Sequence, residues 1–250
     1  MSPLWEERPG PAGPLAVHVA PGRAATAAAT LVLCHGFPLE RDAAGRTGRT
    51  FPALADRLAD ESGWEVLTGC LRGVGLSPGN FSLDGWLADL RALVDAAAPS
   101  RRAGVWLVGF GTSGALSLCL AAEDRRVRGV ACFGSAATFT DWAEDLPGMV
   151  DFARQVGVIT DPAFPPDLKA WGRAFLELRP AEAAAKVAPR PMLIVHGTED
   201  KGVPVSDARL LADAGGPSAE LRLVGGAGHR LRADPRAIAL LVGWLERQGP

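Results

Sequence analysis

The stretch Leu107-Val108-Gly109-Phe110-Gly111-Thr112-Ser113-Gly114-Ala115 decides the fold of this 250-residue chain. An apolar run at 105–108 leads into it, and a segment with a helical pattern at 115–122 follows it. A short apolar run, a glycine-rich turn and a helical pattern indicate a strand, a sharp turn and a helix. The stretch therefore predicts one strand–helix unit of an α/β fold.

The same alternation continues along the chain in both directions. Apolar runs of the kind buried on both faces of a parallel sheet occur at 30–34, 64–68, 127–133, 191–197 and 219–224. Segments with helical spacing occur at 51–60, 84–97, 113–122, 206–214 and 235–247. The weakly alternating segment 15–19 fits an edge strand, and the polar segment 39–50 fits a loop. We expect a mostly parallel sheet with helices on both faces, in a single domain over 1–250.

Residues 136–188 interrupt the alternation of strands and helices. Two stretches of helical spacing are separated there by a proline-rich bend at 162–166. We expect a small inserted helical lid over this range. Its large aromatic residues, expected to line a pocket, are Trp142, Phe152, Trp171 and Phe175. The alternative is that these side chains only seal the core of the domain.

Composition excludes several classes of partner. The formal net charge of −2 gives no reason to expect nucleic acid or an anionic membrane as a partner. Residues 1–10 lack the pattern of a secretory signal, and no apolar run approaches the roughly 18 residues of a membrane span. The four cysteines form no C-x-x-C pair, and the four histidines are scattered singly. We expect buried reduced thiols, a cytoplasmic location, no metal and no cofactor. The oligomeric state is not encoded in any visible pattern.

Five motifs carry a resemblance to a known family. They are His35-Gly36, Arg72-Gly73-Val74-Gly75-Leu76-Ser77, the stretch 109–114, His196-Gly197-Thr198-Glu199-Asp200, and Gly226-Ala227-Gly228-His229. In this order, from residue 30 to the end, the chain resembles the α/β-hydrolase superfamily. The part from 191 onward looks most like its dienelactone hydrolase and prolyl-oligopeptidase branches.

The resemblance implies roles for individual residues. The family orders its catalytic groups as nucleophile, acid and histidine, which places the acid at Asp200 and the general base at His229. The backbone N–H groups of Phe37 and Thr112 take the positions of an oxyanion hole. Glu199 lies next to the acid, but the spacing favours Asp200.

The nucleophile position departs from the family. The family places a serine at the centre of G-x-S-x-G, and this chain has Gly111 there. Glycine adopts a positive φ without a Cβ penalty, so Gly111 is compatible with the shape of the turn. It has no oxygen with which to attack a carbonyl group.

Other residues offer weak replacements for the missing nucleophile. Ser113 is expected in the first helical turn, pointing away from the pocket, and the Thr112 side chain should point in a different direction from residue 111. Cys34 lies in a buried strand, and Ser135 ends another strand. His196 is interpreted as a packed or loop-bonding histidine.

Three interpretations stay open. The chain is a hydrolase of a small apolar ester, amide or lactone in which His229 and Asp200 activate water, or use the same base for proton abstraction. Alternatively, it is a non-catalytic protein that binds a small apolar ligand in the cleft. The third interpretation is that Gly111 is an engineered replacement of a serine. All three imply a small-molecule ligand or substrate.

Overall fold

The computed structural model describes residues 5–22, 30–40, 43–97 and 104–249. In this part of the chain the strands are β1 (Glu6–Arg8), β2 (Leu15–Ala20), β3 (Thr30–Cys34), β4 (Glu65–Gly69), β5 (Val105–Phe110), β6 (Val127–Phe133), β7 (Met192–Gly197) and β8 (Ala219–Val224). The α-helices are α1 (Ala43–Ser62), α2 (Leu83–Ala97), α3 (Thr112–Glu123), α4 (Thr140–Glu144), α5 (Leu146–Val156), α6 (Leu168–Glu177), α7 (Pro180–Val187), α8 (Val205–Gly215) and α9 (Pro235–Gln248).

The strands form one eight-stranded sheet in the order β1-β2-β4-β3-β5-β6-β7-β8. The pairs β1–β2 and β2–β4 are antiparallel, and every other neighbouring pair is parallel. Strands β3 and β5 are buried along their whole length, as expected of strands covered on both faces. The mostly parallel α/β fold predicted from the sequence is confirmed.

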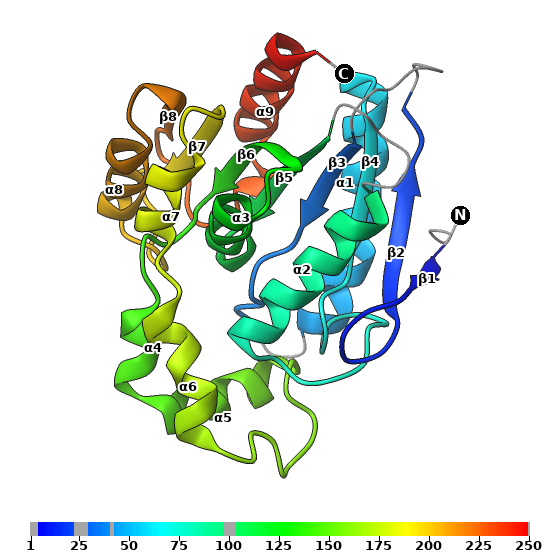
Figure 1. The fold of residues 1–250 in the computed structure, drawn as a ribbon, viewed down its shortest axis with the longest axis vertical. Coiled ribbons are helices and arrows are strands. Elements are labelled where there is room, and N and C mark those ends of the chain that lie inside the picture. Colours follow the sequence, from blue (N-terminus) through cyan, green and yellow to red (C-terminus); the bar gives the residue numbers. More distant parts are fainter. Residues whose placement is uncertain (1–4, 23–29, 41–42, 98–103, 250) are drawn as a thin grey trace.

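Helices cover both faces of this sheet (Figure 1). One apolar core lies under α2, α3, α7 and α8 and includes Trp86, Leu118 and Leu211. A second core lies under α1 and α9 and includes Leu58 and Trp244. Because the six strands from β3 onward run parallel, their carboxyl ends meet at one edge of the sheet, where the loops are free to hold functional groups.

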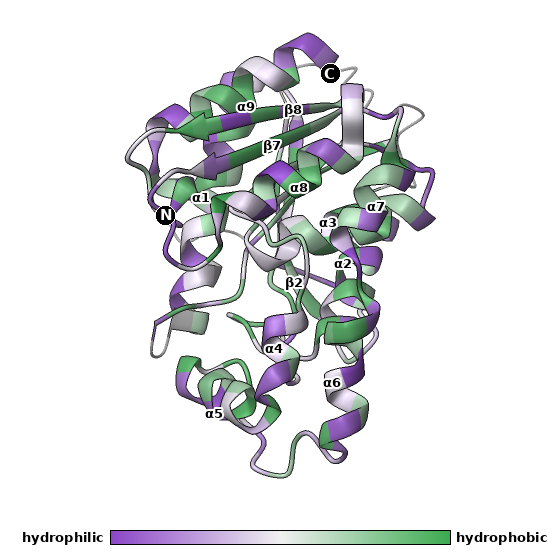
Figure 2. Cartoon of the chain, turned by 90° about the vertical axis from the view of Figure 1, so that its left-hand side faces the viewer, coloured by the Kyte–Doolittle hydropathy of each residue, from purple (hydrophilic) through white to green (hydrophobic). Residues whose placement is uncertain are grey.

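The segment between β6 and β7 contains two kinds of helix. Helices α4, α5 and α6 extend beyond the carboxyl edge of the sheet (Figure 1), and in Figure 2 each of them carries both hydrophobic and hydrophilic residues. Helix α7 instead packs against α3 and α8 in the helical layer. Asp145 and Asp167 cap α5 and α6 by accepting hydrogen bonds from Gly148 N and Ala170 N. Of the range 136–188 expected as a lid, only the part up to α6 overhangs the sheet.

Two expectations about local structure are wrong. The segment 39–50 is not a loop throughout, because α1 begins at Ala43. The first turns of α1 show no apolar periodicity in the sequence, because they consist of small and polar residues. One of these, the exposed Arg46, lines a cavity. Strand β2 is not an edge strand, because it pairs with both β1 and β4. Within the described residues, no helix is long and apolar enough to span a bilayer.

Candidate active site

Gly111 occupies the sharp turn between β5 and α3. Its backbone has φ 53° and ψ −124°, and its N–H donates a 2.8 Å hydrogen bond to the carbonyl of Phe133. A side chain at Gly109 would overlap the backbone of Gly114, and one at Gly114 would overlap Ser135. The glycines at 109, 111 and 114 therefore allow β5 and α3 to approach closely at a positive-φ turn.

Asp200 and His229 meet at the same edge of the sheet. Asp200 follows β7 and His229 follows β8, and Asp200 Oδ2 lies 2.8 Å from His229 Nδ1. A carboxylate in such a pair only accepts, so Nδ1 carries the proton and donates it. The lone pair of the neutral imidazole is then on Nε2, the nitrogen that can take up a proton.

The Asp200 carboxylate is held in place from several sides. Its side chain is fully buried, and Oδ1 accepts from Gly202 N at 2.8 Å and from Val203 N at 3.0 Å. Burial acts to raise the pKa of Asp200, but the hydrogen bonds from His229, Val203 and Gly202 outweigh it and hold the pKa below its ordinary value. Asp200 is therefore a fixed negative charge behind His229.

His229 Nε2 faces the position of the absent side chain. A Cβ at position 111 would lie 3.4 Å from His229 Nε2, in ordinary van der Waals contact. Since the His229 side chain is 24% exposed, this space is open to small molecules from the solvent. The acid and base expected from the motifs are thus brought together over Gly111.

Phe37 and Thr112 line a cavity together with Gly111. The loop after β3 presses against the turn, because the Gly36 Cα would be 3.7 Å from a Cβ at position 111. Thr112 is the first residue of α3, so its N–H has no acceptor within the helix. Phe37, Thr112 and His229 line the same cavity, so the two residues expected to supply an oxyanion hole lie at the candidate site.

His35 holds the loop that carries Phe37. Its side chain is buried, with Nδ1 3.0 Å from the Gly36 carbonyl and Nε2 accepting from Leu71 N at 3.0 Å. Burial lowers the pKa of His35 from 6.5 to about 4, so the ring is neutral at pH 7. This role in joining two loops could not be inferred from the His35-Gly36 motif.

Acid should destabilise the protein through His35. Its pKa is lower in the folded than in the unfolded chain, so the unfolded chain binds more protons between about pH 6.5 and pH 4 and stability falls as the pH falls through this window. The full effect is about 3 kcal/mol, by the conversion of 1.36 kcal/mol per pKa unit. Urea unfolding at a series of pH values measures it. In His35→Gln the slope in this window should flatten, and an unchanged slope would assign the effect to other groups.

Of the four alternative residues, Ser113, Cys34 and Ser135 are buried in the interior, and Thr112 lines a cavity beside Gly111 and His229. Ser113 is fully buried, and its hydroxyl donates a 2.5 Å hydrogen bond to the His35 carbonyl. Burial raises the pKa of Cys34 to about 12, which keeps its thiol protonated. The Ser135 hydroxyl is buried against Gly114 and has no hydrogen-bond partner among the described residues.

His196 lies closer to the site than its sequence position suggests. It is a packed histidine, as expected, and its Nε2 is 3.0 Å from the Val203 carbonyl. The same nitrogen lies 3.5 Å from Asp200 Oδ2, the oxygen that also accepts the hydrogen bond from His229 Nδ1. The spacing of four residues between His196 and Asp200 across the end of β7 was the available signal.

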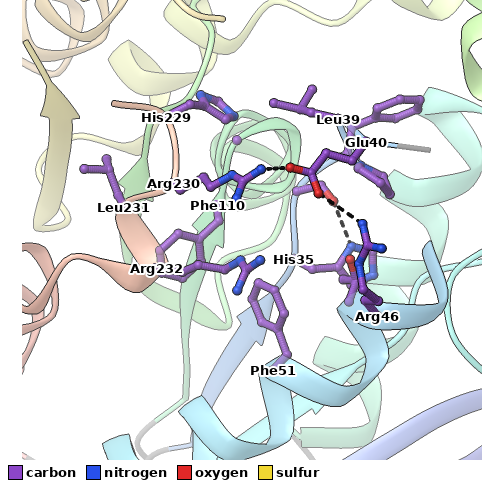
Figure 3. A pocket seen from close by; sticks show the side chains of 15 residues that line it. His35, Leu39, Glu40, Arg46, Phe51, Phe110, His229, Arg230, Leu231 and Arg232 are labelled. Atoms are coloured by element: carbon purple, nitrogen blue, oxygen red, sulfur yellow. Dashed lines mark hydrogen bonds and ion pairs between the residues drawn. The ribbon is translucent and has the colours of Figure 1, made fainter. Parts of the chain in front are cut away.

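Two cavities meet at Gly111 and His229. The first, of about 170 Å³, is lined mainly by apolar side chains, including Phe139, Trp142 and Phe152. The second, of about 130 Å³, lies on the side of α1 and is lined by Arg46, Arg230 and Arg232 among others (Figure 3). These arginines come from α1 and from the segment after His229 and belong to no sequence motif, so the sequence gives no signal for them.

The four aromatic residues expected to line the pocket divide into two pairs. Trp142 and Phe152 line the larger cavity. Trp171 and Phe175 do not, because they are buried in the core and the Trp171 indole donates a 3.0 Å hydrogen bond to the Phe81 carbonyl. Helical spacing is the same for both pairs, so only packing separates them. Within the described residues, His, Cys, Asp and Glu side chains form no group of three or more that could hold a metal ion.

Comparison with known proteins identifies the class to which this fold and site belong. A model of the alpha/beta hydrolase family matches residues 31–239. The chain therefore belongs to the alpha/beta hydrolase family. No curated protein sequence matches it.

Solved structures share the fold along nearly the whole chain. An alpha-beta serine hydrolase homologue from Coxiella burnetii is 21% identical, with a TM-score of 0.65 over 99% of this chain and 98% of its own. The α/β hydrolase GrgF from Penicillium sp. sh18 is 18% identical, with a TM-score of 0.73 over 98% of each chain. Est1E from Butyrivibrio proteoclasticus, solved with ferulic acid bound, is 19% identical, with a TM-score of 0.74 over 97% of each chain.

Proposed function

We propose that the protein hydrolyses a small apolar ester, amide or lactone, using water that His229 activates in place of a serine nucleophile. The single observation that carries this proposal is the intact pair of Asp200 and His229, with Nε2 aimed at the space over Gly111. Family membership makes a hydrolase the natural class of activity. Gly111 determines which kind of hydrolysis is available.

The geometry supports direct attack by water, without an acyl-enzyme intermediate. A water molecule over Gly111 gives a proton to His229 Nε2 while its oxygen bonds to the carbonyl carbon. The carbonyl oxygen becomes an oxyanion and accepts hydrogen bonds from the N–H groups of Phe37 and Thr112. His229 then returns the proton to the leaving oxygen or nitrogen as the old bond breaks. Asp200 stabilises the transient imidazolium throughout, because its buried carboxylate keeps a full negative charge.

The larger cavity indicates where the apolar part of the substrate binds. Its walls come from Phe37, Trp142, Phe152 and neighbouring apolar side chains, and it opens on Gly111. Rings of this kind favour flat apolar groups of similar size. The related fold of Est1E holds ferulic acid, a small aromatic carboxylic acid. By analogy, esters of small aromatic acids are the first substrates to test. In this proposal α4, α5 and α6 act as a lid.

Intact-mass kinetics test the water mechanism. Wild-type protein is mixed with p-nitrophenyl esters of small aromatic acids, and both p-nitrophenol release and the mass of the protein are followed from the first turnover. We expect steady release without a burst and without an acyl adduct, since water attacks the substrate directly. A stoichiometric burst with an acyl adduct would contradict the proposal and locate a nucleophile on the chain.

The second candidate function is non-catalytic binding of a small apolar ligand. The observation that favours it is Gly111 itself, which has no side chain to present to His229 Nε2. Saturable binding of an aromatic ester that is recovered unchanged after long incubation would support this candidate over hydrolysis. We also propose, from residues 191–250, a relationship to the dienelactone hydrolase and prolyl-oligopeptidase branches of the family. The proposed location is cytoplasmic.

A further inference from the structure

The smaller cavity is basic, which the proposed reaction does not require. Arg46, Arg230 and Arg232 line it together with a single carboxylate, Glu40. Figure 3 shows Arg46 entering from α1, and Arg230 and Arg232 entering from the segment after His229. Counting these four side chains, the cavity carries two uncompensated positive charges at neutral pH.

The single carboxylate is already used by two of the three arginines. One oxygen of Glu40 contacts Arg230, and the other accepts from Arg46 at 3.0 Å. Glu40 thereby links the loop after β3 to α1 and to the segment after His229. Both of its oxygens are engaged within this chain, so it does not serve Arg232.

Arg232 is left facing the cavity without an acidic partner among the described residues. Its guanidinium lies 6.0 Å from the centre of the Phe51 ring (Figure 3), a cation–π contact that orients the charge without neutralising it. The intervening Leu231 is fully buried and fixes the backbone between Arg230 and Arg232. Arg232 is an exposed residue in which partial desolvation and then repulsion by Arg230 lower the pKa of the guanidinium, and a bound anion would counter that repulsion.

The two cavities differ in charge as well as in polarity. The acidic residues Asp141 and Asp207 border the larger, mainly apolar cavity, and Asp207 accepts a 2.9 Å hydrogen bond from Ala137 N. An anionic group is therefore repelled from that side and attracted to the arginine side. The walls of both cavities include Phe37, Leu39, Gly111 and His229, so a molecule that spans the two cavities passes Gly111 and His229.

We propose that the smaller cavity is a subsite for an anionic oxygen group, carboxylate or phosphate, and that Arg232 is its main ligand. The substrate then has an apolar arm toward Trp142 and Phe152, a reacting carbonyl at His229 and an anionic arm toward Arg232. This assignment rests on the proposed function in placing the carbonyl at His229. The volume of about 130 Å³ suits a carboxylate or phosphate on a short linker, being about that of four water molecules.

Equilibrium binding tests the subsite without requiring turnover. The probes are 4-phenylbutyrate, the neutral 4-phenylbutyramide of the same length, and 3-phenylpropylphosphonate, measured by calorimetry at low salt. We expect wild-type protein to bind the carboxylate about tenfold or more tightly than the amide, because hydrogen bonds to a charged group exceed those to a neutral one. A tighter phosphonate would assign the natural group to the phosphate type, and a weaker one to the carboxylate type.

The matched variants are Arg232→Gln and Arg209→Gln. Both remove one positive charge, but Arg209 is an exposed residue of α8 outside the cavity. Arg232→Gln should abolish the preference for the anionic probes and leave amide binding unchanged, whereas Arg209→Gln should retain the preference. Equal binding of acid and amide by wild-type protein, or a preference that survives in Arg232→Gln, would overturn the subsite. The readout is equilibrium binding and requires no turnover, whereas the intact-mass kinetics test hydrolysis, so failure of the subsite is distinguishable from failure of the proposed function.

Discussion

Gly111→Ser should convert the protein into a fast serine esterase. The new Oγ would extend from a Cβ 3.4 Å from His229 Nε2, within reach of a hydrogen bond to the base. Loss of the nucleophile from a serine triad costs on the order of a million-fold in turnover, so even an imperfectly aligned serine should raise the hydrolysis of p-nitrophenyl acetate by about 10³-fold. A fluorophosphonate probe should label the variant at position 111 and leave wild-type protein unlabelled.

Gly111→Ala is the matched control for this experiment. Both variants introduce a Cβ at φ 53° and ψ −124°, a sparsely populated conformation, and both should lose about 1–3 kcal/mol of stability for that reason. Only the serine adds a hydroxyl group, so the alanine variant should show no gain in rate and no labelling. If Gly111→Ser folds but is neither labelled nor faster than Gly111→Ala, His229 is not poised as a general base.

His229→Ala should abolish most of the wild-type activity. Removal of a general base costs about 10²–10⁴-fold, and the residual rate comes from binding and the backbone donors alone. The measurement is the turnover of the ester that wild-type protein hydrolyses fastest, with thermal unfolding as a check on folding. If His229→Ala turned over this ester as fast as the wild-type protein, His229 would have no role as a general base.

Asp200→Asn tests whether the tautomer and orientation of the His229 ring matter when His229 itself is still present. An amide at this position can donate to Nδ1, which moves the proton of the imidazole to Nε2 and removes its lone pair from the site. Activity should therefore fall although His229 is present. His18→Ala in β2, where the ring pairs with Asp56, is the control for loss of a histidine elsewhere and should leave turnover unchanged.

The order of strands and helices was predictable because each element is encoded locally. Runs such as Thr30–Cys34 and Val105–Phe110 are apolar on both faces, and this pattern by itself indicates a strand covered by helices. The early turns of α1 escaped prediction for the opposite reason. Their exposed residues, including Arg46, have no apolar period to follow.

The candidate site was predictable only where a motif encodes it. The motifs place Asp200 after β7 and His229 after β8, and in the structure Asp200 Oδ2 and His229 Nδ1 lie 2.8 Å apart. Helical spacing could not separate Trp142 from Trp171, because one faces the cavity and the other packs under Phe81.

By itself, the sequence determined the parallel α/β scaffold and the glycine at the turn after β5, because local patterns and backbone sterics act between near neighbours in the chain. Only the tertiary structure decided that His229 Nε2 faces the position where Gly111 has no side chain. It also decided that His35 joins two loops through its hydrogen bonds. Beside the same space it placed Arg232, which has no acidic partner among the described residues. The physical reason is that hydrogen bonds, burial and charge balance depend on side chains from distant segments. Their distances exist only once the sheet has brought its loops to one edge.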